Sequence, residues 1–71
     1  MAKYYSVKCS YGVNSQFYDR AQSAHAHNTQ ATFVTDAKAA YAVAQGTTAD
    51  QISTTQIQSN LSTPKTNSLT I

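Results

Sequence analysis

The segment from Tyr4 to Tyr11 constrains the fold of this chain more than any other. Its residues alternate between two sides of an extended backbone, one formed by Tyr5, Val7, Cys9 and Tyr11, the other by Tyr4, Ser6, Lys8 and Ser10. A period of two is typical of a half-buried β-strand, and tyrosine and valine suit a pleated surface. We therefore expect an N-terminal strand over about residues 4–10, which starts a short sheet.

A chain of 71 residues is long enough for one small domain, in the size range where a lone hydrophobic core is marginal. Hydrophobic residues make up 41% of the chain, but eleven of them are alanines, which bury little area each. A fully buried large side chain contributes about 1.5–3 kcal/mol, against a backbone ordering cost of roughly 1–2 kcal/mol per residue. The sequence therefore predicts a domain that buries part of its surface against another chain.

The surface is expected to be polar but largely uncharged. Charged residues make up 11% of the chain, whereas serine, threonine, asparagine and glutamine supply 29 residues. A net charge of +2 does not make the basic stripe of a committed nucleic-acid binder. An uncharged polar surface is poorly protected against association, which favours a place within an assembly.

The sequence carries no sign of export or membrane insertion. Cys9 is the single cysteine, so it cannot form an internal disulfide and does not indicate an oxidising compartment. No long apolar run follows Lys3, and none approaches the ~18 residues of a membrane span. We expect a soluble protein with no membrane partner, in a virion or in the cytoplasm.

Two helices are expected in the middle of the chain. The first covers about residues 16–27, after a turn at Gly12 and an N-cap at Asn14 or Ser15. Its apolar stripe would consist of Phe17, Ala21 and Ala24. A polar loop explains this segment nearly as well. The second covers about residues 36–45, where Thr35 is a natural N-cap and Gly46 a natural end. Tyr41 would anchor this second helix among small side chains. Between the two helices, Gln30 to Val34 is short and β-prone.

The last third of the chain is less clear. Thr48 to Gln51 matches a capping box, but Ile52 to Ile57 is as easily a strand, so residues 49–61 can be helix or strand. Taken together, the patterns predict a small α+β domain over residues 1–61, with one or two short helices. Residues 62–71 are expected to form an extended C-terminal arm or tail.

Reactive side chains do not form a recognisable site. His25 and His27, with Cys9 and Asp19, could suggest a metal, but a helix would point residues i and i+2 apart and no known ligand spacing is present. Cys9 and His25 could act as nucleophile and base only if the fold brought them together with a third, orienting group. We therefore expect no metal, no cofactor and no enzymatic activity.

The C-terminal arm carries the strongest functional signal. Leu69 and Ile71 alternate with Thr70, so the arm could add as a strand to a neighbouring subunit, through main-chain hydrogen bonds and side-chain pockets. A disordered end is the alternative. The residues expected to contact partner subunits are Tyr4, Lys8, Tyr11, Tyr41, Leu69 and Ile71.

A second functional hypothesis is binding of single-stranded nucleic acid. Aromatic and basic residues interleave near the N-terminus, and bases stack on aromatic faces beside cations that neutralise phosphate. The residues for this role are Tyr4, Lys8, Tyr11 and Arg20. Tyrosines at a protein interface explain the same pattern without a nucleic acid.

A third hypothesis comes from the order of the expected elements. A strand, a polar connection, Phe33-Val34, a helix, Gly46 and a further strand loosely resemble the small linker domains of cyanobacterial phycobilisomes. This chain departs from them, because it has a single arginine and lacks their Gly-Gly before the last strand. The resemblance implies a small linker in a pigment-protein complex, and it assigns no functional residue.

We expect, first, a non-catalytic structural subunit of a larger protein assembly, most concretely a small virion component such as a capsid decoration or tail protein. The nucleic-acid-binding module and the linker are the alternatives.

Overall fold

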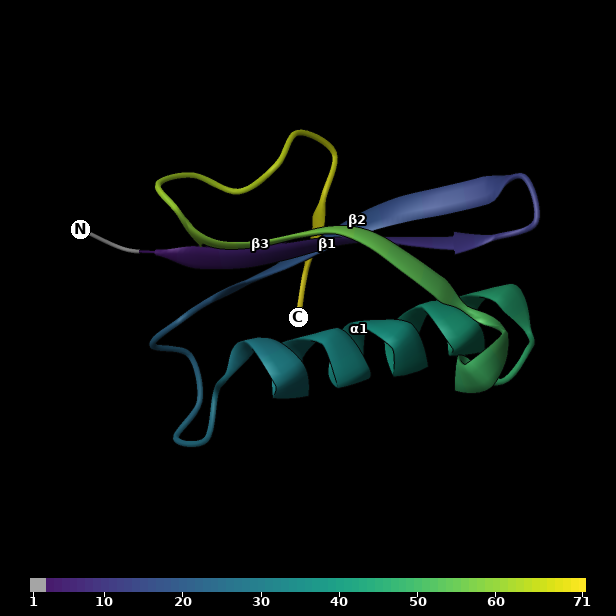
Figure 1. The fold of residues 1–71 in the computed structure, drawn as a ribbon, viewed down its shortest axis with the longest axis horizontal. Helices are drawn as coiled ribbons and strands as arrows, with labels where there is room; N and C mark the ends of the chain where they lie inside the picture. Colours follow the sequence, from purple (N-terminus) through teal and green to yellow (C-terminus); the bar gives the residue numbers. More distant parts are fainter. Residues whose placement is uncertain (1–2) are drawn as a thin grey trace.

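The computed structural model describes residues 3–71. Within them the chain forms a four-stranded sheet and one α-helix, in the order β1 (Tyr4–Tyr11), β2 (Asn14–Ala21), α1 (Gln30–Gln45), the 3₁₀ helix η1 (Ala49–Gln51), β3 (Ser53–Leu61) and β4 (Leu69–Thr70). The strand order in the sheet is β3-β1-β2-β4, and α1 lies along one face of it (Figure 1). The expected α+β class and the N-terminal strand are confirmed.

β1 and β2 form an antiparallel hairpin. Tyr11 pairs with Asn14, which leaves Gly12 and Val13 as a two-residue turn. Gly12 has a φ of +60°, a backbone conformation that glycine adopts without steric cost and that tight hairpin turns require. The two-residue turn thus places β2 directly beside the central strand.

The expected helix over residues 16–27 is wrong. Every residue of β2 pairs with β1, and residues 22–27 form turns and bends. The helical stripe through Phe17, Ala21 and Ala24 is mostly alanine, which buries little area. The extended chain instead buries Tyr18 on the helix side and completes a row of backbone hydrogen bonds, so long-range pairing outweighs the local period.

α1 begins at Gln30, earlier than the expected Asp36. Thr29 is the N-cap: its side chain accepts a hydrogen bond from the Thr32 backbone N–H at 3.2 Å, and the Thr32 hydroxyl accepts one from the Thr29 N–H at 2.9 Å. This reciprocal pair satisfies two backbone donors at the helix start. Residues 30–34, expected to be β-prone, are therefore helical, and Gly46 (φ +69°) ends the helix as predicted.

The ambiguous stretch after α1 divides into the short 3₁₀ helix η1 and the strand β3. Thr48 does not form a side-chain cap to the backbone; its hydroxyl donates to the Asp50 carboxylate instead. β3 then pairs antiparallel with β1, with register shifts along its length. Gln56 and Asn60 have positive φ angles of 53° and 62°, and these irregularities interrupt the exposed edge of the sheet.

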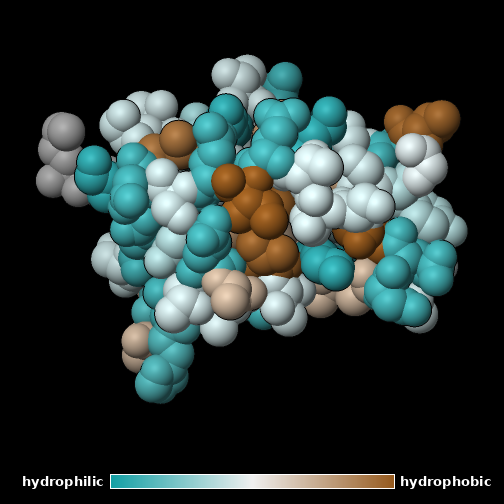
Figure 2. Space-filling view, viewed as in Figure 1, coloured by the Kyte–Doolittle hydropathy of each residue, from teal (hydrophilic) through white to brown (hydrophobic). Residues whose placement is uncertain are grey.

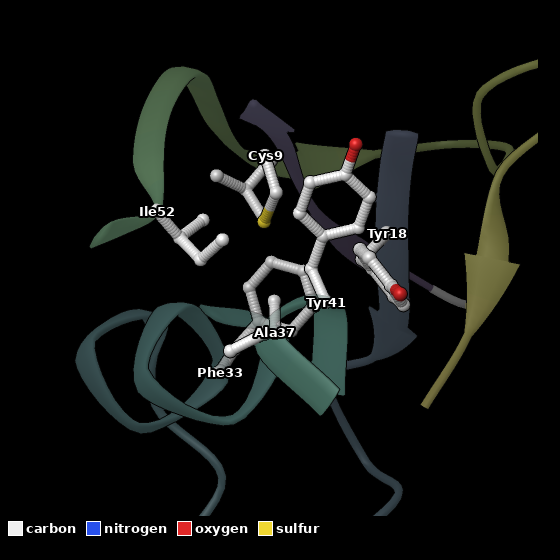
Figure 3. Close-up of a cluster of buried hydrophobic side chains, with 8 residues drawn as sticks. Cys9, Tyr18, Phe33, Ala37, Tyr41 and Ile52 are labelled. Atoms are coloured by element: carbon white, nitrogen blue, oxygen red, sulfur yellow. The ribbon is translucent and has the colours of Figure 1, made fainter. Parts of the chain in front are cut away.

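The hydrophobic core lies between the sheet and α1 (Figure 3). It consists of Val7, Cys9, Tyr18, Phe33, Ala37, Tyr41, Ala42 and Ile52. Phe33 is fully buried and stacks against Tyr5 with 5.8 Å between ring centroids, while Tyr41 meets Tyr18 edge to face at 6.2 Å. The inner face of β1 is thus covered by the helix of its own chain.

The C-terminal arm (residues 62–71) passes over the face of the sheet opposite α1 and then runs down past the edge of β2 (Figure 1). β4 pairs parallel with β2, with Leu69 opposite Tyr18 and Thr70 opposite Asp19. The arm is therefore an added edge strand, and in this structure it adds to the sheet of its own chain.

Candidate functional site

The acceptor for the C-terminal arm is the outer edge of β2. The Ile71 backbone N–H donates to the Asp19 carbonyl oxygen at 3.0 Å, and the Gln16 side-chain amide donates to the Asn67 carbonyl at 2.6 Å. The Ile71 side chain packs against the core cluster. Main-chain and side-chain contacts together seat the arm at a defined register.

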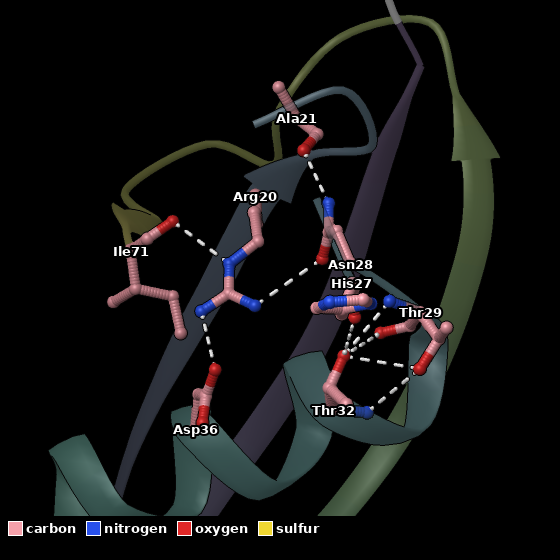
Figure 4. A network of polar contacts seen from close by, with 8 residues as sticks. All are labelled: Arg20, Ala21, His27, Asn28, Thr29, Thr32, Asp36 and Ile71. Atoms are coloured by element: carbon pink, nitrogen blue, oxygen red, sulfur yellow. Dashed lines mark hydrogen bonds and ion pairs between the residues drawn. The ribbon is translucent and has the colours of Figure 1, made fainter. Parts of the chain in front are cut away.

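Arg20 connects the arm, β2 and α1 (Figure 4). Its Nε donates to the Ile71 carbonyl at 3.2 Å, Nη1 donates to Asn28 Oδ1 at 3.3 Å, and Nη2 lies 2.8 Å from Asp36 Oδ2. The guanidinium carbon also lies 5.7 Å from the centroid of the Phe33 ring. Arg20 is only 5% exposed, so the positive charge expected to meet phosphate is used inside the protein.

An open hollow of about 530 Å³ lies beside this network, lined by Arg20, His25, Ala26, His27, Asn28, Thr32 and Asp36. Both histidines are exposed, whereas Cys9 is fully buried in the core. The structure therefore does not bring the imagined nucleophile and base together. Among residues 3–71, no group of three histidine, cysteine, aspartate or glutamate side chains is placed to hold a metal.

Cys9 is unsuited to nucleophilic chemistry. Burial raises the pKa of its thiol from 9.0 to about 11, and the positive charge of Lys38 offsets only part of this effect. Burial likewise raises the pKa values of the Tyr18 and Tyr41 hydroxyls. The thiolate is the reactive form of cysteine, so a thiol that stays protonated in the core is chemically inert.

The residues expected to contact partners lie in separate places. Tyr4 and Lys8 are half-buried on the sheet face opposite α1, and Tyr11 is exposed at the end of the hairpin. Tyr41, the expected helix anchor, is 3% exposed inside the core. The structure thus brings together Leu69 and Ile71 at the edge of β2, and it also brings Leu69 and Tyr41 to one hollow of about 360 Å³ that Tyr18 lines as well.

Leu69 leaves apolar surface on the outside of the arm. It is 51% exposed, and Ile71 is half-buried beside it. Figure 2 shows a largely hydrophilic surface with hydrophobic side chains gathered near its centre, between the level of the sheet and that of α1 in Figure 1. Leu69 lies at the β4 edge of the sheet, at the opposite end of the strand order from β3.

Sequence reasoning missed two features of the site. It placed Arg20 in a helix and on the surface, because the pairing of β2 with β1 was not recognised. It also missed a shallow groove of about 460 Å³ between α1 and β3, lined by Gln30, Ala31, Val34 and Ile57. The exposed Ile57 was visible in the sequence, but its neighbours across the groove depend on how the helix packs.

Comparisons with protein families, with curated proteins and with solved structures found no match for this chain. Within the described residues, no helix has the length and apolar character needed to span a membrane.

Proposed function

We propose that this protein is a non-catalytic subunit of a larger protein assembly and that the C-terminal arm connects its subunits by strand addition. The observation that carries the proposal is the seating of the arm: a two-residue strand held at a sheet edge by an acceptor built from β2, Arg20 and the core. The most concrete version is a small virion component, such as a capsid decoration or tail protein.

The acceptor is separable from the arm that fills it. β4 contacts β2 through two register pairs, and the other arm contacts come from Gln16, Arg20 and Phe17. All of these acceptor groups belong to β2, so the arm of a second copy can make the same contacts. Exchange of an identical element between copies adds no new chemistry and is a common route to assemblies.

The composition supports the same role. A surface dominated by uncharged polar residues has little charge repulsion to keep copies apart. The half-exposed Leu69 adds apolar area at the point where subunits would join. The burial of Cys9, which keeps its thiol protonated, supports a role without catalysis.

The connector between β3 and β4 supplies the test. Deleting Thr63 and Pro64 keeps Lys65, Asn67, Leu69 and Ile71, which make the arm contacts, but shortens the path by which the arm returns to its own β2. We expect this variant to form dimers or longer oligomers through exchanged arms, seen by light scattering after size-exclusion chromatography, because short hinge segments favour swapping. A folded, strictly monomeric variant at high concentration would contradict the proposal.

The matched control removes the arm itself. A chain ending at Ser62 retains the acceptor but cannot donate a strand, so combining this truncation with the full chain should yield capped complexes rather than extended ones. If assembly is unchanged when the arm is deleted, the arm is not the connection.

Binding of single-stranded nucleic acid receives less support from the geometry. Arg20 is buried in an ion pair with Asp36, which leaves Tyr4 and Lys8 on the sheet face and Tyr11 at the hairpin end. If the protein binds single-stranded nucleic acid, its affinity for oligonucleotides should fall steeply as the salt concentration rises. The double substitution Tyr4→Ala and Lys8→Ala should also remove this affinity. Absent or salt-insensitive binding removes this alternative.

A further inference from the structure

A row of polar side chains crosses the sheet on the face opposite α1. Ser6 on β1 pairs with Asp19 on β2 and with Gln58 on β3. Side chains that lie directly opposite each other on paired strands point to the same face, and this face is the reverse of the one that carries Val7 and Tyr18. The three polar side chains are therefore neighbours on three adjacent strands.

Two members of this row are fully buried and Gln58 is half-buried, although the row lies outside the hydrophobic core. Ser6 and Asp19 both have 0% exposure. The segment that leads from β3 to β4 passes over this side of the sheet (Figure 1), and Lys65 from that segment lies 5.8 Å from the ring centroid of Phe17, two residues from Asp19. The C-terminal arm thus forms the cover over a polar layer.

Four oxygen atoms in this layer lack a hydrogen-bond partner among residues 3–71: Ser6 Oγ, both carboxylate oxygens of Asp19, and Gln58 Oε1. A buried carboxylate without a partner is strongly unfavourable, and buried polar groups in folded proteins are nearly always satisfied. Such a cluster therefore requires a group that supplies positive charge or hydrogen-bond donors.

The positive side chains nearby do not supply that charge. Arg20 faces the other side of the sheet and pairs with Asp36. Lys65 lies over the Phe17 ring. Lys8 is on the same face as Asp19, but in the register of β1 and β2 it lies opposite Phe17. Within the described chain, no lysine or arginine lies within ion-pair distance of the Asp19 carboxylate.

We propose that Ser6, Asp19 and Gln58 form a binding site for a hard metal cation beneath the C-terminal arm. Hydroxyl, carboxylate and amide oxygens are the ligands that hard cations such as Na⁺, K⁺ and Ca²⁺ take. The carboxylate oxygens and the amide oxygen can only accept, which suits a cation. A single carboxylate balances a single charge, so a monovalent ion leaves the buried site neutral.

The site also touches the arm contact. Asp19 presents its side chain to the polar row, while its main-chain carbonyl accepts the hydrogen bond from the Ile71 N–H. An ion held by the side chain would fix the part of β2 that holds the end of the arm. The cation site does not depend on whether arms are exchanged between copies.

The test is the melting temperature of the full chain in sodium, potassium and calcium chloride, each compared with choline chloride at equal ionic strength. We expect a saturable rise with at least one metal cation over choline, because a ligand that binds only the folded state stabilises it. Equal melting temperatures in all four salts would mean that water fills the layer, and would overturn the proposal.

Variants of the three ligands make the test specific. Asp19→Asn keeps the shape but removes the charge, and it should abolish the difference between metal and choline; a difference that persists would overturn the proposal. Ser6→Ala, a milder change, should raise the cation concentration needed for half the effect by at least about tenfold. Ser10→Ala, on the same face of β1 but outside the row, should leave that concentration unchanged.

Discussion

The two faces of the sheet are built from the same strands but differ in kind. On the side of α1, Val7, Cys9 and Phe33 form a contiguous apolar core, tied together by aromatic contacts. Ser6 and Asp19 each lie one residue from a core position along their strands, so their side chains point to the opposite face. There they form a polar layer whose oxygen atoms have no hydrogen-bond partner within residues 3–71. The helix covers the first side and the C-terminal arm covers the second.

This difference separates stability from binding. The helix side is packed by one chain, because Phe33 and Tyr41 supply the large side chains that the alternating face of β1 needs, and the Tyr41 hydroxyl is its one buried polar atom without a partner among residues 3–71. The opposite side holds four such oxygen atoms, on Ser6, Asp19 and Gln58. We therefore expect substitutions on the helix side to dominate folding stability, and those on the arm side to affect binding and assembly more than folding.

The largest effect is expected from Phe33→Ala. Phe33 is fully buried at the centre of the helix-side core, and removing such a ring costs about 3–5 kcal/mol through lost burial and the cavity left behind. Urea denaturation measures this loss, which is a large part of the 5–15 kcal/mol of a typical domain. Val43→Ala is the control: Val43 is 82% exposed on the same helix, and its change should stay within about 0.5 kcal/mol.

The next effect is a loss of stability at high pH. The Cys9 thiol has a pKa of about 11 in the folded protein and 9.0 as an ordinary thiol, so the unfolded chain releases this proton more readily. Stability is therefore full below pH 9.0 and falls as the pH rises toward 11, by up to about 3 kcal/mol. Tyr18 and Tyr41 act in the same direction once the pH passes 10.0, the ordinary pKa of tyrosine, because burial raises the pKa of both hydroxyls.

Denaturation of the wild type and of Cys9→Ala across this pH range measures the effect. The variant lacks the thiol, so its stability should fall less between pH 9.0 and 11 than that of the wild type, whatever its starting value. Parallel pH profiles for the two proteins would show that the thiol does not meet a desolvated environment in the core.

A smaller effect is expected at the helix start. Thr29→Ala removes the side-chain acceptor for the Thr32 N–H and should cost about 1 kcal/mol in thermal or urea unfolding. Thr35, the cap that the sequence favours, is exposed within the helix, so Thr35→Ala should cost little. The reverse order of the two effects would mean that α1 begins where the sequence predicts.

The smallest effect on folding is expected on the arm side. Lys65→Ala removes the contact between the Lys65 ammonium and the Phe17 ring, and should lower stability by less than about 1 kcal/mol. Lys3→Ala, at an exposed position, is the matched charge control. A loss as large as that of Phe33→Ala would show that the arm side contributes equally to folding, which would end the contrast between the two faces.

Part of the candidate site was visible in the sequence. The alternation of Leu69 and Ile71 correctly marks the arm as an extended segment, and the Cys9 position on the alternating face of β1 correctly places it in the core. Arg20 and Asp19 were not recognisable, because their roles depend on the register between β1 and β2. A charged residue on a short polar segment looks exposed until its paired strand is known.

The sequence by itself determined those elements whose pattern is local. Strict alternation defines β1, the alanine-rich run ended by Gly46 defines the second half of α1, and together they establish the α+β class. These patterns suffice because side-chain period and helix propensity act between residues close in the chain.

The tertiary structure alone decided the rest. The start of α1 at Gln30 is the exception, because the local Thr29–Thr32 capping pair sets it without the usual glutamate or glutamine. β2 forms because β1 offers it a full row of hydrogen bonds, and the arm lies along β2 because Arg20 and the core contact it. Both depend on partners distant in sequence, and local preference among small polar residues is too weak to decide them.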